Sequence, residues 1–143
     1  MEAFSFVAVG AGLGAALLLT ALAGMILGVA ISADLSRAAL KDDPSLSDEA
    51  LAARVDEALK TDLPRPAVLT QLIVLSLVGA AIGGAVTVLV AGHSGWLNPA
   101  LTAVGLGALN LYPTKLLPLR PRLVTALLTL PATGFGAYLM TIS

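Results

Sequence analysis

The sequence predicts an all-α, polytopic integral membrane protein: a bundle of four transmembrane helices with a short amphipathic cytoplasmic helix between the first and second spans. Hydrophobic residues make up 57% of the chain and charged residues 12%, against about 25% charged residues in ordinary soluble domains. The mean hydropathy is +0.93. No charged residue lies between Ala3 and Ala33, between Pro66 and Lys115, or after Arg122. A hydrocarbon layer about 30 Å thick needs roughly 20 apolar residues of helix, and these uncharged stretches are long enough to supply several such helices.

The four predicted spans cover residues 4–33, 67–92, 97–112 and 123–142 of a single membrane domain, residues 1–143. The first span would measure about 45 Å as a helix, so we expect it to tilt or to project into the cytoplasm. The third is short, about 24 Å, and it is flanked by Trp96 and Tyr112, aromatic residues of the kind found at membrane interfaces. Pro113, Pro118 and Pro121 separate it from the fourth span.

The first span is expected to be retained rather than cleaved as a signal peptide. Met1 and Glu2 lead into it without a Lys or Arg. Its apolar run is also about twice the length of a signal-peptide core.

The basic residues predict the topology, because short cytoplasmic loops carry the excess of Lys and Arg. They fall in two segments: Arg37, Lys41, Arg54, Lys60 and Arg65 in the first, and Lys115, Arg120 and Arg122 in the second. Four spans place residues 34–66 and 113–122 together in the cytoplasm, with both termini outside. An alternative with three spans, in which residues 97–112 form a re-entrant element, would separate the two segments across the membrane. We therefore expect four spans, in a bacterial cytoplasmic membrane.

The cytoplasmic segment contains a predicted amphipathic helix of about four turns. Ser47 is its expected N-cap, since a serine hydroxyl accepts from the unpaired N–H groups of a first turn, and Asp56 and Lys60 have the spacing of an ion pair. One face presents the apolar residues Leu51, Val55, Ala58 and Leu59. That face either contacts a partner protein or forms the shallow hydrophobic side of a solvated connector.

Small residues at four-residue spacing predict close helix packing within the membrane. Three such pairs are Gly10 with Gly14, Gly24 with Gly28, and Gly79 with Gly83. Whether their partner helices belong to the same chain or to another subunit is left open by the sequence.

Polar residues within the spans are candidates for hydrogen bonds between helices or for a polar path. Asn110 and Gln71 are predicted to lie at about the same depth. Thr125, Thr129 and Thr133 form a hydroxyl stripe on the fourth span, in a helix that Pro131 interrupts.

Two further residues are interpreted structurally. Asn98 is expected to cap the third span, with Pro99 at its first helical position. His93, the one histidine in the sequence, is interpreted as an ordinary loop residue.

The chemistry missing from the sequence limits the function. Ionisable residues inside a membrane usually mark ion pathways or proton relays, and the predicted spans place none at depth. The chain has no cysteine, which excludes disulfides and thiolate ligands, and it shows no catalytic, phosphate-loop or zinc pattern. We expect no enzymatic activity, no cofactor, no metal and no nucleic-acid partner.

Two hypotheses for function remain. The first is a non-catalytic membrane subunit, structural or accessory, that packs in a larger membrane protein assembly. The second is a small homo-oligomeric channel, holin-like pore or permease, with a conduit between copies formed by Asn110, Thr125, Thr129 and Thr133. A pore need not contain charges. The expected partners are the lipid bilayer and either other membrane subunits or copies of the chain itself.

Overall fold

The computed structural model describes residues 4–62, 66–92, 95–112 and 118–142, which confirm the predicted all-α class. His93 and Lys115 lie outside the described residues. The described residues form five helices and no strand: α1 (Phe6–Asp42), α2 (Asp48–Asp62), α3 (Pro66–Ala91), α4 (Leu97–Leu111) and α5 (Leu119–Thr141).

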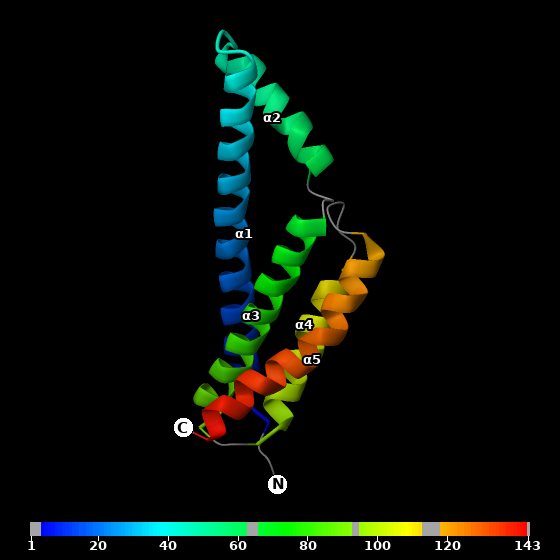
Figure 1. Ribbon diagram of the computed structural model, residues 1–143. Helices are drawn as coiled ribbons and strands as arrows, with labels where there is room; N and C mark the ends of the chain where they lie inside the picture. Colours follow the sequence, from blue (N-terminus) through cyan, green and yellow to red (C-terminus); the bar gives the residue numbers. More distant parts are fainter. Residues whose placement is uncertain (1–3, 63–65, 93–94, 113–117, 143) are drawn as a thin grey trace.

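Three of the described helices, α1, α3 and α5, are long and apolar enough to cross a membrane, while α4 is a shorter apolar helix of 15 residues. In Figure 1, α1 begins and α5 ends at the same end of the bundle, and the connection between α1 and α2 lies at the opposite end. α3 packs against both α1 and α5, and α4 packs mainly on α5. The three long helices support membrane association by their length and composition.

α1 is longer than the sequence predicts, ending at Asp42 rather than near Ala33. Its last three turns are polar, but they contain good helix formers and local support. The Ser36 hydroxyl donates to the Ser32 carbonyl, and Arg37 pairs with Asp34 at 3.4 Å. Helices usually end before the residue that precedes a proline, and Pro44 accordingly follows the end of α1. The apolar pattern showed where a membrane can lie but not where the helix ends.

α2 follows the prediction for the cytoplasmic segment. The Ser47 hydroxyl accepts from the N–H of Ala50 at 3.3 Å, and Lys60 pairs with Asp56 at 2.6 Å. That ion pair raises the pKa of the exposed Lys60. In the turn between α1 and α2, the hydroxyl and N–H of Ser45 donate to the Asp43 carboxylate and lower its pKa.

α5 begins four residues before the predicted start of the fourth span, at Leu119. Pro121 therefore lies inside the first turn instead of breaking the chain. This position is tolerated because the first N–H groups of a helix have no carbonyl partner within it, so a missing N–H there costs little.

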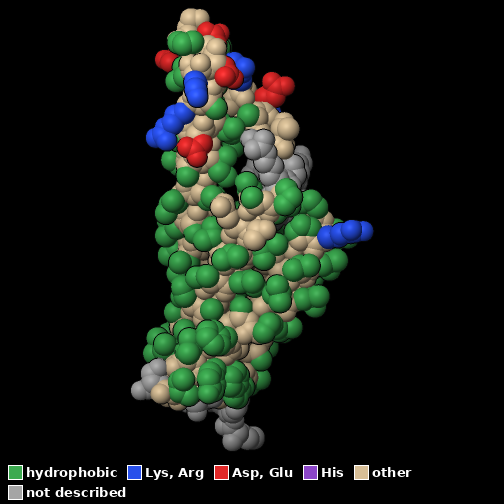
Figure 2. Space-filling view, in the orientation of Figure 1, with side chains coloured by type: hydrophobic (Ala, Val, Ile, Leu, Met, Phe, Trp, Pro, Cys, Tyr) green, Lys and Arg blue, Asp and Glu red, His purple; other side chains and the backbone are tan. Residues whose placement is uncertain are grey.

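The bundle is apolar outside and partly polar inside. Phe6, Ile26 and Leu127 are 82%, 71% and 68% exposed, whereas the largest fully buried side chains are those of one asparagine and four threonines: Asn98, Thr87, Thr102, Thr129 and Thr133. Figure 2 shows hydrophobic side chains over the bundle, most of the charged ones gathered along α2 and the adjoining end of α1, and one basic group apart from them at the edge of the bundle. Since lipid offers no hydrophobic drive for helices to associate, small and weakly polar side chains inside and large apolar ones outside suit a membrane.

Glycine allows the backbones of α1, α3 and α5 to touch. A Cβ atom at Gly83 would lie 2.8 Å from the Gly12 carbonyl oxygen, between α1 and α3. Between α3 and α5, a Cβ atom at Gly84 would overlap the Thr133 carbonyl, and one at Gly136 would overlap the Ala81 carbonyl. Backbone atoms cannot swing aside, so these positions admit no side chain without moving a helix.

Replacing Gly136 with alanine is expected to destabilise the protein by about 1–3 kcal/mol, the usual cost of overpacking a well-packed interior. The matched control is Gly14→Ala, where no atom lies within 4 Å of the added methyl. This control should be neutral or slightly stabilising within the chain, because alanine favours helix more than glycine does. Thermal unfolding in detergent, followed by Trp96 fluorescence, measures both. Equal effects of the two substitutions would contradict the close contact at Gly136.

Candidate functional site

The six glycines predicted to pack helices divide into two groups. Gly79 and Gly83 lie buried in the contact between α1 and α3. Gly10, Gly14, Gly24 and Gly28 have no atom of another part of the described chain within 4 Å of an added Cβ. Within the chain, the contact face of α1 is instead formed by Gly12 and Ala16, which are buried.

The stretch from Gly10 to Ala16 contains two overlapping small-residue patterns, Gly10 with Gly14 and Gly12 with Ala16. Residues two apart on a helix point about 200° apart, so the two patterns face opposite sides. Nothing in the spacing distinguishes the inward pattern from the outward one. Gly84 and Gly136 were also missed, although Ala80-x-x-x-Gly84 has the same small-residue spacing.

The predicted threonine stripe of α5 faces the interior of the chain. Thr129 and Thr133 are fully buried and Thr125 nearly so. Each hydroxyl donates to the carbonyl one turn earlier, at Pro121, Thr125 and Thr129, over 2.7–2.8 Å. The three hydroxyls therefore find their acceptors on their own helix. None of them donates to the Leu127 carbonyl, which has no N–H partner at Pro131.

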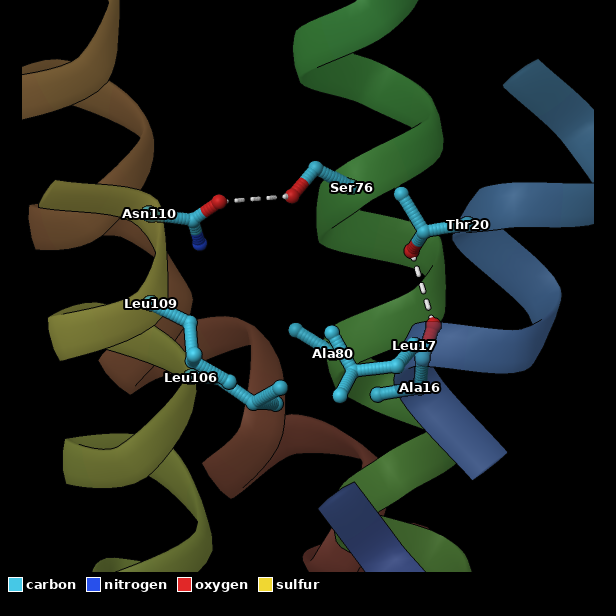
Figure 3. Close-up of a pocket in the computed structure, with 8 residues that line it drawn as sticks. All are labelled: Ala16, Leu17, Thr20, Ser76, Ala80, Leu106, Leu109 and Asn110. Carbon is cyan, nitrogen blue, oxygen red and sulfur yellow. Dashed lines mark hydrogen bonds between the residues drawn. The ribbon is translucent and has the colours of Figure 1, made fainter. Parts of the chain in front are cut away.

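A polar layer joins three helices at the level of Asn110. The Ser76 hydroxyl of α3 donates to Asn110 Oδ1 at 3.4 Å, and Asn110 Nδ2 donates to Thr129 Oγ1 at 3.1 Å. Figure 3 shows Asn110 of α4 and Ser76 of α3 pointing toward each other across the bundle. Gln71, the other residue expected at this depth, is exposed on α3.

A second group of polar contacts lies nearer the start of α1. The hydroxyls of Thr87 and Thr102 lie 3.0 Å apart, joining α3 to α4. Asn98 Oδ1 accepts from the Ser5 N–H at 2.9 Å, and the Ser5 hydroxyl in turn accepts from the N–H of Ala8. The prediction that Asn98 caps its own helix is wrong, because α4 begins at Leu97. The buried asparagine binds instead to the capping residue of α1.

Two cavities adjoin the polar layer and share Thr20, Ser76 and Asn110 as lining residues. The first, of about 50 Å³, lies above the small apolar core of Ala16, Ala80 and Leu106. Figure 3 shows the polar side chains at one end of this cavity and the apolar ones at the other. The second cavity, of about 140 Å³, extends toward the start of α5 and is lined there by Arg122 and Thr125.

In the sequence, Arg122 indicates only the topology, as one of the basic residues of the second segment. Its Nε atom is buried and has no hydrogen-bond partner among the described residues. Buried donors are nearly always paired, so this atom is an exception that calls for a physical explanation. Because Arg122 precedes an uncharged span, the sequence indicated a charge at the membrane interface. It gave no sign that this residue lines a cavity.

The apolar face of α2 lies against the end of α1. Leu51, Val55 and Leu59 line a groove of about 410 Å³ whose other side includes Ser36 of α1. Ala58, on the same predicted face, is half-buried. The groove is therefore open to an additional occupant, and its role in binding a partner stays a prediction.

The described residues bring together no group of three His, Cys, Asp or Glu side chains that would hold a metal ion. No protein-family model, no curated protein and no solved structure matches this chain.

Replacing Asn110 with alanine is expected to destabilise the bundle by about 1 kcal/mol, since hydrogen bonds between membrane helices contribute roughly 0.6 kcal/mol each on average. The loss follows from breaking the two contacts that link α4 to α3 and α5. Gln71→Ala, which removes an exposed amide from α3, is the control and should leave stability unchanged. Thermal unfolding in the same detergent compares them, and an unchanged unfolding temperature for Asn110→Ala would show that the polar layer contributes nothing.

Proposed function

We propose that the protein is a non-catalytic integral membrane subunit that packs in a larger membrane protein assembly, with α1 as its main contact helix. The observation that carries this proposal is the exposure of α1. In the most apolar 18-residue stretch of each long helix, 6% of α1 is buried within the chain, against 33% of α3 and 33% of α5. α1 thus presents most of its surface to whatever surrounds the chain.

The glycines on α1 suggest that this surface meets other helices as well as lipid. At about 100° per residue, Gly10, Gly14, Gly24 and Gly28 fall within a sector roughly 80° wide. Gly12, the inward glycine, points to the other side. A glycine inside a helix costs about 1 kcal/mol relative to alanine, and no close contact within the chain requires these four. Close approach of a helix from another subunit would give each of them a packing role.

We further propose four membrane crossings, with both termini outside and residues 34–66 and 113–122 in the cytoplasm of a bacterial cell. Support comes from the start of α1 and the end of α5, which lie at one end of the bundle as an even number of crossings requires (Figure 1). α4 runs beside α5 despite being only about 22 Å long. The groove between α1 and α2 would then be a second contact surface, on the cytoplasmic side.

The topology can be tested by single-cysteine labelling, because the natural chain contains no cysteine. With four crossings, Ile142→Cys in intact cells is expected to react with a membrane-impermeant maleimide. Ser45→Cys, in the turn between α1 and α2, should react only after the membrane is permeabilised. Protection of Ile142→Cys would instead support three crossings with a re-entrant α4.

The assembly proposal can be tested by replacing Gly24 and Gly28 together with leucine. The added side chains should block the outward face of α1 and reduce the mass of the complex extracted gently through an affinity tag. Leu22→Phe with Val29→Phe, which adds bulk to a side of the same helix roughly 100–160° away from the two glycines, is the control and should leave the mass unchanged. An unchanged mass for the glycine variant would contradict the proposed contact face.

The composition of the extracted complex separates the two hypotheses for function. Different subunits support the accessory role, whereas copies of the chain alone would favour a pore or permease. The burial of Thr125, Thr129 and Thr133 inside one chain favours the accessory role, because a conduit between copies would need these hydroxyls at a surface. A Thr129→Val variant that altered flux through liposomes would overturn this preference.

A further inference from the structure

We propose that the cavity beside Arg122 is a binding site for a phosphate group. The cavity, of about 140 Å³, lies among α1, α3, α4 and α5 at the end of the bundle where α5 begins. A water molecule occupies about 30 Å³ of liquid, so the cavity has room for roughly four or five waters. A phosphate group, with five heavy atoms, is of similar size.

Arg122 has an Nε atom that is buried without a hydrogen-bond partner among the described residues. Leaving a buried donor without an acceptor costs about 1–3 kcal/mol, and more when the group is charged. The described residues provide no acceptor for it. The Nε atom itself has no solvent-accessible surface, so the guanidinium has to turn toward the cavity that Arg122 lines before an oxygen from outside the chain can remove this penalty.

Charge also favours an anion at this position. The sequence contains no Asp or Glu after Asp62, and none between Ala3 and Ala33. The ion pairs of the described residues join Arg37 to Asp34 and Lys60 to Asp56, all of them outside the cavity. Arg122 therefore has no ion-pair partner among the described residues, and an anion in the cavity would balance its charge.

The hydrogen-bond donors at the cavity favour phosphate in particular. Arginine presents five N–H groups in a planar fork that matches phosphate oxygens. The Ser76 hydroxyl reaches Asn110 Oδ1 only at 3.4 Å, well beyond the usual 2.7–2.8 Å for such a bond, so it can turn to a better acceptor. Thr20 and Thr125 donate to carbonyls of their own helices at 2.8 Å, so they supply no further donor.

Donors from α3 and α5 thus face a common space from different directions. A carboxylate offers two oxygens in one plane, while a phosphate offers oxygens in tetrahedral directions and suits such an arrangement better. The phosphate can belong to an anionic lipid headgroup or be free in solution, and both would make the same contacts. A phosphate site at Arg122 is independent of the proposed role in assembly.

The test uses the purified full-length protein in dodecyl maltoside micelles, which contain no phosphate, with binding followed through its effect on thermal unfolding. One arm adds phosphatidylglycerol to the micelles, a second adds inorganic phosphate to the buffer, and a third adds acetate. We expect saturable stabilisation in the first or second arm, which identifies the source of the phosphate, and none with acetate. Arg122→Gln should weaken binding about tenfold or more, as expected for the loss of a hydrogen bond to a charged group.

Arg120→Gln removes the same charge from the same turn of α5, at an exposed position outside the cavity, and should keep the wild-type affinity. Ser76→Val retains every basic residue, removes one donor and should also weaken binding, so the proposal stays testable where Arg122→Gln fails to fold. Equal losses in the two arginine variants would show a diffuse charge effect and overturn the site. Equal protection by acetate, or no protection by phosphatidylglycerol and phosphate, would overturn it as well.

Discussion

Close approach of helix backbones is the constraint on which the rest of this structure depends. Lipid chains are as apolar as leucine, so burying leucine between helices gains little in a membrane, and association has to come from contact at short range. α3 lies in the middle of the bundle because it has small residues on two of its faces. Gly79 and Gly83 face α1, while Gly84 receives the backbone of α5. Large side chains at these positions would hold the helices apart, and the polar layer at Asn110 would then have no partners to reach.

The same closeness explains how threonines and an asparagine are tolerated inside the bundle. An unsatisfied polar group in hydrocarbon costs several kcal/mol, and here the hydroxyls of α5 return to carbonyls of their own helix. Only a few groups reach across helices, notably Asn98, Asn110 and the pair of Thr87 with Thr102. These contacts fix which helices meet and at what height, whereas the glycines fix how near they come. Arg122 is an exception, because its buried Nε atom has no partner among the described residues. Its surroundings therefore suggest a ligand.

The uneven burial of the helices links the fold to its proposed role. A self-sufficient four-helix bundle would bury its helices to similar extents, but α1 packs against the others mainly along its first half and then continues alone toward α2 (Figure 1). Its outward glycines and the groove beside α2 lie on the part of the molecule that the chain itself leaves uncovered. These uncovered features are the ones that support the proposed role as a subunit of a larger assembly.

Much of the fold follows from the sequence alone, because helix formation and the length of an apolar stretch depend on residues that are close together in the sequence. Uncharged stretches long enough for a bilayer identified α1, α3 and α5, and cap and ion-pair spacing identified α2 with Ser47, Asp56 and Lys60. The true end of α1 and the start of α5 were missed, since helix continues past the apolar residues. Which small residues pack inward, Gly12 rather than Gly10 or Gly14, was decided only by the tertiary structure. Small-residue patterns occur on opposite faces of the same helix. Which face meets a neighbour depends on how the other helices surround it. The burial of the Arg122 Nε atom, and the place of Arg122 in one cavity with Ser76, were decided in the same way, because four helices line that cavity.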